Sequence, residues 1–280
     1  GTMNSTVTSI AATRQPVMIL GESGTGKEQI ARYLYLHSPF STNPIIVINC
    51  ELAGNKTWDF LLNHYNSPFN DADCTIYVQH LEMISPTRSA ELLSLLLDTG
   101  LQRRQRLIFS STCQEGEQLP DVVLTYIQRL GCLSLHLPTL RSRKEEISSL
   151  ASLYLGSLNQ EIGTQIAGFE PRAIEQLRAF EWPNNYTQFR KVLQSLAVIT
   201  KSSYINTQDV AEILAQEREF ASQAHKTEPP APVEGTLEEI ICNVIRQTIE
   251  SKGGNQTAAA KQLGISRTTM WRHLNQYPKE

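Results

Sequence analysis

The sequence predicts an α/β protein with all-helical additions, and three observations lead to this prediction. A glycine-rich turn lies between an apolar strand and a helix, strands and helices alternate up to about residue 137, and the remainder is wholly helical. We expect an α/β core with a P-loop and a mostly parallel sheet over 1–140, and a helical lid subdomain over 141–221. After a linker over 222–235, we expect an all-α helix-turn-helix domain over 236–280. Because the first strand begins close to the start of the sequence, we also expect the core to be truncated at its N-terminus.

The turn after the first strand, which spans 17–20, carries the most specific pattern in the chain. It reads Gly21, Glu22, Ser23, Gly24, Thr25, Gly26, Lys27 and Glu28, and a helical pattern follows it over 29–36. Glycines let successive backbone N–H groups converge on an anion, and the helix N-terminus and Lys27 add positive charge. Serine or threonine usually follows the lysine, where this chain has Glu28. We predict a loop that binds nucleotide phosphates; the alternative is an ordinary glycine turn.

Four further strands complete the predicted core. Short apolar runs predict them over 45–48, 75–78, 106–110 and 133–137. Leucines at positions 92, 93, 95, 96 and 97 predict a largely buried helix over 89–98. Strands and helices that alternate in this way form a mostly parallel sheet with both faces covered.

The lid subdomain is predicted from apolar positions at helical spacing. Its four helices are expected over 144–158, 171–180, 185–199 and 207–220. Pro171 and Pro183 lie where helices start, as the fixed φ and missing N–H of proline favour. The polar stretch 222–235 holds three prolines without periodicity and is expected to be an extended linker.

The tail is predicted to fold as three helices. The first spans 237–251 and ends at Gly253 and Gly254; Asn255 caps the second, which runs to about Leu263, and Ser266 caps the third. Two short helices joined by a turn at Gly264 and Ile265 are typical of a helix-turn-helix. Ala258, Ala259 and Ala260 allow a close crossing of these helices, and Trp271 is expected in their core with Ile265, Met270 and Leu274.

The third helix of the tail is the candidate DNA-binding element. Its candidate contacts are Ser266, Arg267, Thr268, Thr269, Arg272 and His273. From Lys252 onward there are five Lys or Arg residues and one acid, in a chain of net charge −3. Such a local excess of positive charge suits a double-stranded DNA backbone. The alternative is a solvated helical hairpin.

Composition sets limits on the class of protein. Hydrophobic residues make up 40% and charged residues 19%, as in ordinary globular proteins. No apolar run reaches the length of a membrane span, and we expect a cytoplasmic protein with no membrane partner. The five cysteines lack C-x-x-C spacing, and the six histidines lie on separate segments, so we expect neither a disulfide frame nor a metal site.

Five segments resemble one family. They are Gly21–Glu28, 47–50 (VINC), 135–147 (LHLPTLRSRKEEI), 182–185 (WPNN) and 253–274. Together they are similar to the P-loop, second strand, lid entry, lid sensor segment and Fis-like tail of NtrC-type bacterial enhancer-binding transcription regulators. The resemblance implies an AAA+ ATPase that forms hexamers and remodels RNA polymerase carrying sigma-54. It also implies a response regulator, since a receiver domain normally lies upstream in this family.

The chain departs from this family at the positions that hydrolyse ATP. Gln79 and His80 stand where the family has an acidic pair at the end of the third strand. Val123 stands at one of the two positions of the arginine fingers, which stabilise the transferred phosphoryl group. Cys113 stands in place of a polar sensor residue, and Thr187 in place of the lid arginine that reaches the nucleotide. The stretch between Asn49 and Thr75 is also too short for the loop that contacts sigma-54. Hydrolysis needs carboxylates to hold Mg²⁺ and to orient water. We therefore expect no catalytic residue and no efficient enzyme, although ATP or ADP can still bind, with Mg²⁺ left open.

These losses resemble a degenerate subgroup that controls biofilm and exopolysaccharide genes and responds to cyclic di-GMP. The resemblance implies a cyclic di-GMP contact at Arg32, a homo-oligomer (a dimer or larger) and action with the ordinary RNA polymerase at promoter DNA. Two alternatives remain open. One is an active sigma-54-dependent ATPase in which Glu82 or His80 serves catalysis. The other is a nucleotide-binding architectural protein whose tail bends DNA.

Overall fold

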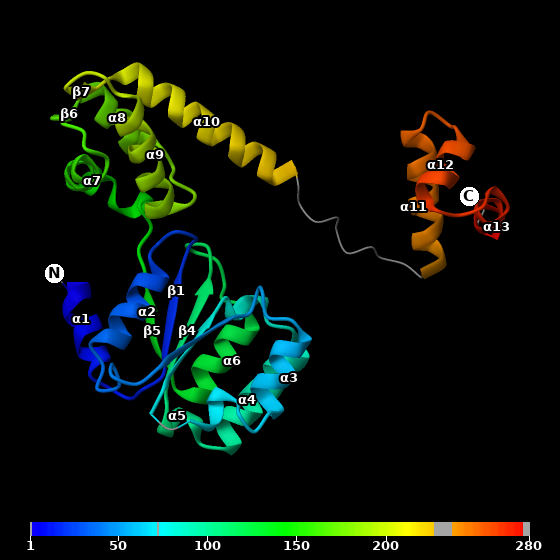
Figure 1. The fold of residues 1–280 in the computed structure, drawn as a ribbon, viewed down its shortest axis with the longest axis horizontal. Helices are drawn as coiled ribbons and strands as arrows, with labels where there is room; N and C mark the ends of the chain where they lie inside the picture. The colour runs from blue at the N-terminus through cyan, green and yellow to red at the C-terminus, as the bar shows by residue number, and fades with distance from the viewer. Residues whose placement is uncertain (1, 72, 227–236, 277–280) are drawn as a thin grey trace. The chain divides into compact units, whose positions relative to one another are not determined.

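The computed structural model describes residues 2–71, 73–226 and 237–276. The chain forms two compact units, Gly1–Gln216 and Glu217–Glu280, and each is described here by itself. The first unit contains the α/β core and the lid, and the second contains the helix-turn-helix (Figure 1). None of the helices in the described part of the chain is long and apolar enough to cross a membrane.

The core is built on a five-stranded parallel sheet. Its strands are β1 (Val17–Gly21), β2 (Ile45–Asn49), β3 (Thr75–Gln79), β4 (Arg106–Thr112) and β5 (Leu133–His136), in the order β2-β3-β4-β1-β5. All five were predicted, with ends that differ by at most two residues. The central strands β3, β4 and β1 are buried along almost their whole length because helices cover both faces of the sheet. Parallel strands end at one edge of the sheet, so the loops after β1, β3 and β4 lie together there.

Helices cover the two faces of this sheet (Figure 1). One face packs on α1 (Thr2–Ala11) and α2 (Lys27–Leu36). The other packs on α3 (Asn55–Asn63), α4 (Pro86–Asp98) and α6 (Asp121–Leu130). The remaining short elements of the core are η1 (Pro68–Asn70), η2 (Leu81–Met83) and α5 (Leu101–Arg104).

Helix α1 was not predicted from the sequence. Its polar composition gives a weak signal, but Val7, Ile10 and Ala11 are buried against the sheet. The guanidinium of Arg106, fully buried at the start of β4, donates from Nη2 to the Ile10 carbonyl oxygen at 3.0 Å. Tertiary contacts therefore stabilise this helix, which local propensity alone does not predict.

The lid contains four α-helices around one hydrophobic core. Its elements are η3 (Arg141–Glu146), α7 (Ile147–Ile162), β6 (Gly168–Phe169), α8 (Pro171–Ala179), α9 (Asn185–Ile199), β7 (Tyr204–Ile205) and α10 (Thr207–Lys226). The first helix was predicted from residue 144, but Arg143 has a non-helical φ of −125° and the first turn is a 3₁₀ helix. Trp182 is fully buried, with its ring edge-on to Phe180 and Phe189.

Helix α10 extends beyond its predicted end. It continues to Lys226, so the prediction that the linker starts at residue 222 is wrong for 222–226. The stretch 207–226 contains neither glycine nor proline, and nothing in it ends a helix before Pro229. The rest of the predicted linker, 227–235, lies outside the described residues.

The second unit begins at Glu217, inside α10, and its helix-turn-helix part has the three predicted helices. These are α11 (Leu237–Ser251), α12 (Gln256–Leu263) and α13 (Arg267–Gln276). Gly253 and Gly254 have φ of +61° and +85°, conformations that favour glycine at a helix end. Asn255 Oδ1 then accepts the Ala258 N–H at 3.1 Å and caps α12. Ala259, Ala260 and Met270 are buried in the small core of this unit.

Candidate functional site

The predicted phosphate loop lies between β1 and α2. Gly21 is the last residue of β1, and Lys27 is the first residue of α2. Gly24 and Gly26 have φ of +74° and +96°, so the turn uses backbone conformations that glycine adopts at low cost. The Lys27 ammonium donates to the carbonyl oxygens of Gly21 at 3.0 Å and Glu22 at 2.8 Å. The lysine is therefore held beside the turn in which backbone N–H groups can meet a phosphate.

Burial lowers the pKa of the Lys27 ammonium. The negative charges of nearby groups, first Glu28 and then Glu82, partly offset this lowering of the pKa. The side chain is 5% exposed. A buried cation bonded only to carbonyl oxygens gains from an anion placed next to it. The loop residues thus fit a nucleotide phosphate.

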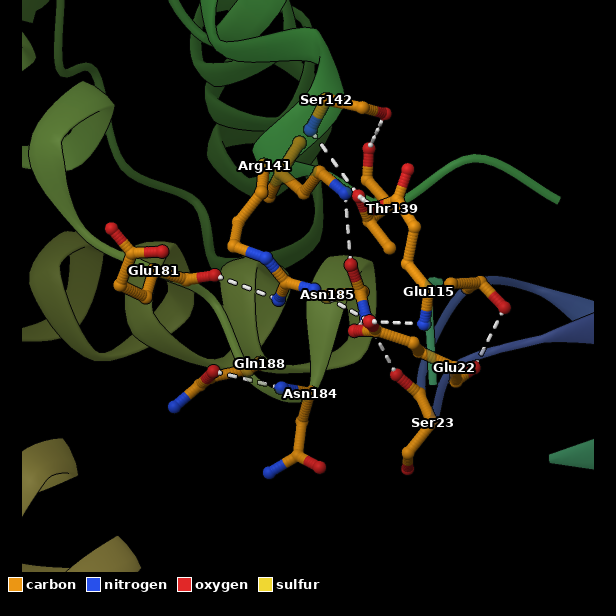
Figure 2. Close-up of polar contacts among 12 residues, drawn as sticks. Glu22, Ser23, Glu115, Thr139, Arg141, Ser142, Glu181, Asn184, Asn185 and Gln188 are labelled. Carbon is orange, nitrogen blue, oxygen red and sulfur yellow. Dashed lines mark hydrogen bonds and ion pairs between the residues drawn. The ribbon is translucent and has the colours of Figure 1, made fainter. Parts of the chain in front are cut away.

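A buried ionic cluster joins this loop to the lid (Figure 2). We call Glu22, Arg141 and Asn185 the Glu22 cluster. Arg141 Nη2 donates to Glu22 Oε1 at 2.5 Å, and Asn185 Nδ2 donates to Glu22 Oε2 at 3.2 Å. Burial alone would raise the pKa of Glu22, but the hydrogen bonds from Arg141, the Glu115 N–H and Asn185 outweigh it and lower the pKa. The carboxylate is therefore ionised and fully engaged.

Asn185 makes two further bonds from its position at the start of α9. Its Oδ1 accepts the Leu140 N–H at 2.8 Å, and its Nδ2 also donates to the Ser23 carbonyl at 3.0 Å. Asn185 and Trp182 both have positive φ, +46° and +52°, which is costly for residues other than glycine. The loop before α9 thus holds a strained backbone where it meets the phosphate loop.

The lid backbone also contacts Gly24 directly. The N–H groups of Tyr186 and Thr187 donate to the Gly24 carbonyl oxygen at 2.9 and 3.4 Å. A Cβ atom on Gly24 would lie 1.9 Å from the Asn184 carbonyl oxygen, far inside van der Waals contact. Glycine is therefore required at this position by space as well as by φ.

The loop after β4 completes the surroundings of Glu22. The Glu115 N–H donates to Glu22 Oε1 at 3.2 Å, and Thr139 Oγ1 donates to Glu115 Oε2 at 2.7 Å (Figure 2). Cys113, which takes the place of a polar sensor, donates its N–H to the Gly21 carbonyl, and burial raises the pKa of its thiol. The Glu22 carboxylate is thus surrounded by the segments that follow β1, β4 and β5 and by the lid entry.

A cavity of about 660 Å³ lies between the phosphate loop and the lid. Gly24, Thr25 and Gly26 line part of it, together with residues of α2, of the segment after β5, of η3, of α7 and of α9, including Tyr154 and Arg190. This volume is in the range of small-molecule sites. Thr187, on α9, also lines the cavity.

The other predicted residues of this region lie in different surroundings. Ser23 and Glu28 are exposed, and Thr25 Oγ1 donates to the Glu22 carbonyl at 2.7 Å inside the turn. Arg32, the candidate cyclic di-GMP contact, is exposed on α2 and is not among the residues that line the cavity.

The end of β3 carries no acidic pair. Gln79 is the last residue of β3, and His80 has φ of +53°. His80 Nδ1 lies 3.2 Å from Glu82 Oε1, while Glu82 Oε2 is buried and has no hydrogen-bond partner among the described residues. In the part of the chain that the structure describes, no group of three or more His, Cys, Asp or Glu residues is arranged to hold a metal ion.

The two positions compared with finger arginines differ in exposure. Val123 is fully buried on α6, in the core that faces β4, and Arg129 is exposed near the end of the same helix. A valine at a fully apolar position supplies packing and no charge. Only Arg129 therefore offers a cation at the surface of α6.

The candidate DNA-binding residues lie on and just before α13. Ser266 Oγ accepts the Thr269 N–H at 3.0 Å and bonds Thr269 Oγ1 at 2.8 Å, so these two residues cap the helix. Arg267, Thr268 and Arg272 are exposed. His273 is half-buried, and its carbonyl oxygen accepts from the Cys242 thiol.

The prediction that Trp271 lies in the core is wrong, because its side chain is 64% exposed. The core positions of α13 are Met270 and Leu274, four residues apart on one face. Trp271 follows Met270 directly and points about 100° away from that face. Its neighbours on the helix surface are Arg267 and Thr268, four and three residues earlier, and its large ring adds to this exposed surface.

Sequence reasoning assigned no individual role to Arg141, Asn185, Tyr154 or Arg190. No chemical motif singles out any of these four residues on its own. Their partners lie up to 163 residues away in the sequence, as for Asn185 and Glu22. Arg141 and Asn185 meet Glu22 where the lid packs on the core, and Tyr154 and Arg190 meet where α7 packs on α9.

The strand order, the phosphate loop after β1 and the helical lid define an AAA+ fold. Three family models match the chain: the Sigma-54 interaction domain over residues 2–97, the AAA+ ATPase lid domain over 141–227, and the Fis family of bacterial regulatory proteins over 236–277. The chain therefore combines a sigma-54 interaction domain, an AAA+ lid and a Fis-type helix-turn-helix, and in this it is similar to NtrC-type enhancer-binding regulators.

Individual relatives match almost the whole length of this chain. The chain is 26% identical over 294 residues to the transcriptional regulatory protein ZraR of Escherichia coli K12, covering 95% of this chain and 64% of ZraR. It is 27% identical over 298 residues to the regulatory protein AtoC of the same organism, covering 96% and 64%. The chain thus spans less than two thirds of the length of these relatives.

A solved structure supports the fold. NtrX from Brucella abortus, crystallised in complex with ATP, superposes with a TM-score of 0.63 at 21% identity, covering 98% of this chain and 66% of NtrX. A second crystal structure of NtrX contains ADP and gives the same score. At this identity the likeness concerns the fold alone.

Proposed function

We propose that the chain is a DNA-binding transcription regulator whose AAA+ unit binds ATP or ADP and self-associates without efficient hydrolysis. The observation that carries this proposal is the pair Gln79 and His80 at the end of β3. An amide cannot serve as an anionic ligand, and the imidazole of His80 is engaged with Glu82. A carboxylate that orients the attacking water is therefore missing from its usual place.

Nucleotide binding is supported by the loop itself. Lys27 is buried beside the turn, Gly24 and Gly26 shape it, and the cavity continues from it along the lid. The crystal structure of NtrX in complex with ATP is in line with a nucleotide in this fold. In the binding step, Lys27 and the N–H groups at the start of α2 would hold the phosphates, and the lid would cover the remainder.

The regulatory part of the proposal concerns ligand and partners. We propose Arg32, exposed on α2, as a contact for cyclic di-GMP in a regulator of biofilm or exopolysaccharide genes. Double-stranded promoter DNA, RNA polymerase and further copies of the chain are the proposed partners. The exposed basic and aromatic surface of α13 supports the DNA contact.

A second candidate is an active sigma-54-dependent ATPase. The observation in its favour is Glu82, whose Oε2 is buried and lacks a partner among the described residues. The charge of Glu82 also acts on the pKa of Lys27, so the carboxylate lies within electrostatic range of the phosphate loop. In this candidate, Glu82 would take the role of the missing acidic pair.

Steady-state ATP turnover with Mg²⁺ at high protein concentration separates the two candidates. We expect the unchanged chain to hydrolyse ATP no faster than the Lys27→Ala variant. In calorimetry we expect ADP to bind the unchanged chain, and to bind Lys27→Ala about tenfold more weakly or worse, because a charge-assisted hydrogen bond is lost. Lys56→Ala, at an exposed lysine of α3, is the matched control. Clear turnover that Glu82→Gln removes would establish the second candidate instead.

The DNA contact has its own test. Arg272→Ala is expected to weaken binding to a selected operator by about 1–3 kcal/mol if its guanidinium reads a base edge. Selection from random duplexes would supply the operator, and fluorescence anisotropy would give the affinity. The exposed Arg218, on α10, offers a control arginine outside the helix-turn-helix. Unchanged affinity and site preference in Arg272→Ala would remove this residue from the interface.

A further inference from the structure

A large apolar side chain lies on the outer surface of α13. The side chain of Trp271 is 64% exposed. Its neighbours on the helix surface, Arg267 and Thr268, are exposed as well. Met270 and Leu274 supply the contacts of α13 with the small core of this unit, and the Trp271 ring is not part of that core. The fold of the helix-turn-helix therefore does not depend on burying this ring.

The indole N–H of Trp271 is also available to a ligand. In the lid, the fully buried Trp182 donates its Nε1–H to the Leu177 carbonyl oxygen at 2.8 Å. Within the part of the chain that the structure describes, the Nε1–H of Trp271 has no such acceptor. A buried tryptophan usually finds a hydrogen-bond partner for this group. Trp271 thus lacks both the burial and the hydrogen bond that hold Trp182 in place.

The surface around the Trp271 ring is positively charged. The stretch 252–276 contains no Asp or Glu, and its Lys and Arg residues are Lys252, Lys261, Arg267 and Arg272. A second copy that docked symmetrically on this surface would bring the same cations to the contact, and like charges would oppose the association. Duplex DNA instead brings phosphates that pair with the cations. The charge therefore favours DNA over a second copy of the chain as the occupant of this surface.

The position of Trp271 along α13 points to the bases more than to the phosphates. In a helix-turn-helix, the N-terminal residues of the second helix contact base edges in the major groove. Helix α13 begins at Arg267, and Trp271 follows four residues later. With a rise of about 1.5 Å per residue, the two Cα atoms are about 6 Å apart along the helix axis. Both side chains therefore belong to the part of α13 that meets the bases.

The base edges in the major groove carry a single kind of apolar group. Guanine, adenine and cytosine present hydrogen-bond acceptors and donors there, whereas thymine also presents its 5-methyl group. An indole ring against the cytosine amino group would remove water from a donor without replacing the hydrogen bond. Against the thymine methyl, the same ring removes apolar surface of both groups from water. An exposed tryptophan in this groove therefore favours thymine.

We infer that the Trp271 ring packs on the 5-methyl group of a thymine in the operator and makes α13 selective for an A·T pair at that position. The inference rests on the proposed function, in which α13 binds double-stranded DNA, and adds a base preference to it. The contact lies one helical turn after Arg267, so hydrogen bonds and apolar packing are both used to read the sequence.

Replacement of single thymines by deoxyuridine tests the inference, because uracil differs from thymine only in lacking the 5-methyl group. The operator is selected from random duplexes, and fluorescence anisotropy gives the affinity for each substituted duplex. At one thymine, we expect the unchanged chain to bind the uracil form about three- to fourfold more weakly, the scale for one buried methyl group. Trp271→Ala is expected to bind the thymine and uracil forms of that operator equally.

Val244→Ala is the matched control, since Val244 is an exposed apolar residue of α11 and lies outside α13. This variant is expected to keep the loss of affinity with uracil. Two results would overturn the inference and leave the proposed DNA binding intact: an operator at which no thymine is sensitive to uracil, or a sensitivity that persists in Trp271→Ala. A change of oligomeric state in Trp271→Ala together with such persistence would assign the ring to a contact between copies. Failure to select any operator would overturn the proposed DNA binding and the inference together.

Discussion

Replacing Gly24 by alanine is expected to lower the free energy of unfolding of the first unit by about 4 kcal/mol, from backbone strain and a steric clash together. The new Cβ would lie 1.9 Å from the Asn184 carbonyl oxygen, and neither atom belongs to a flexible side chain. The lid must therefore move away, and the bonds from Tyr186 and Thr187 to the Gly24 carbonyl are lost. Urea unfolding followed by circular dichroism measures the change.

Gly163→Ala provides a matched control for this prediction. Gly163 ends α7 with φ of +77°, close to the +74° of Gly24, but a Cβ there meets nothing within 4 Å. It therefore reports the cost of the backbone conformation alone, expected to be about 1 kcal/mol. A Gly24→Ala variant no less stable than Gly163→Ala would show that the lid does not rest on the phosphate loop. Limited proteolysis between β5 and η3 offers a second readout of lid release.

The contact at Gly24 gives the phosphate loop a second role. The same carbonyl group that shapes the loop also accepts two N–H groups from the start of α9. A change in the loop when phosphate binds is thus transmitted to the lid through backbone atoms. Thr187 itself has only a short neutral side chain, so its link to the loop is the backbone N–H that bonds the Gly24 carbonyl oxygen.

The sequence was sufficient for the parts of the fold that depend on local pattern. Strands β1 to β5, helix α9 and the three helices of the second unit follow from apolar periodicity and from caps such as Asn255 and Ser266. Helix α1 was missed because its burial depends on the distant β4 and Arg106. Trp271 was misplaced because size suggested burial, while the spacing of Met270 and Leu274 determines which face of α13 is buried.

The candidate site also has a part that the sequence predicts and a part that it does not. The glycines and Lys27 belong to one contiguous stretch, so the turn between β1 and α2 was predictable from the sequence, while its binding of phosphate stays a prediction. The Glu22 cluster was not, because its three members come from the loop, the lid entry and the start of α9. Nothing in the stretch around Glu22 indicates that its carboxylate is buried. Long-range packing, and not motif spacing, determines these contacts.

Substituting Glu22 by glutamine is expected to lower the free energy of unfolding of the first unit by about 3 kcal/mol, the scale for breaking a buried charged hydrogen-bond network. The shape is kept, but only one oxygen remains. If that oxygen accepts from Arg141 and the Glu115 N–H, the new amide group faces the Asn185 amide, donor against donor. The guanidinium of Arg141 also loses its anionic partner.

The pH dependence of stability distinguishes the lost charge from a packing defect. The folded state lowers the pKa of Glu22, so its ionised form stabilises the fold fully above the pKa of an unfolded glutamate, about 4.3. This contribution is lost as the pH falls through the lower, folded pKa. The stability difference between the unchanged chain and Glu22→Gln is therefore expected to be constant near neutrality and to shrink in acid below about pH 4.

Glu175→Gln is the control for this last prediction, because Glu175 pairs with Arg178 on the surface of α8. An exposed pair of this kind contributes about 0–1 kcal/mol, so this variant is expected to remain close to the unchanged chain. A loss in Glu22→Gln no larger than in Glu175→Gln would show that the Glu22 cluster does not hold the lid. A large loss that stays the same from pH 7 to pH 3 would assign the effect to packing and not to the charge of Glu22.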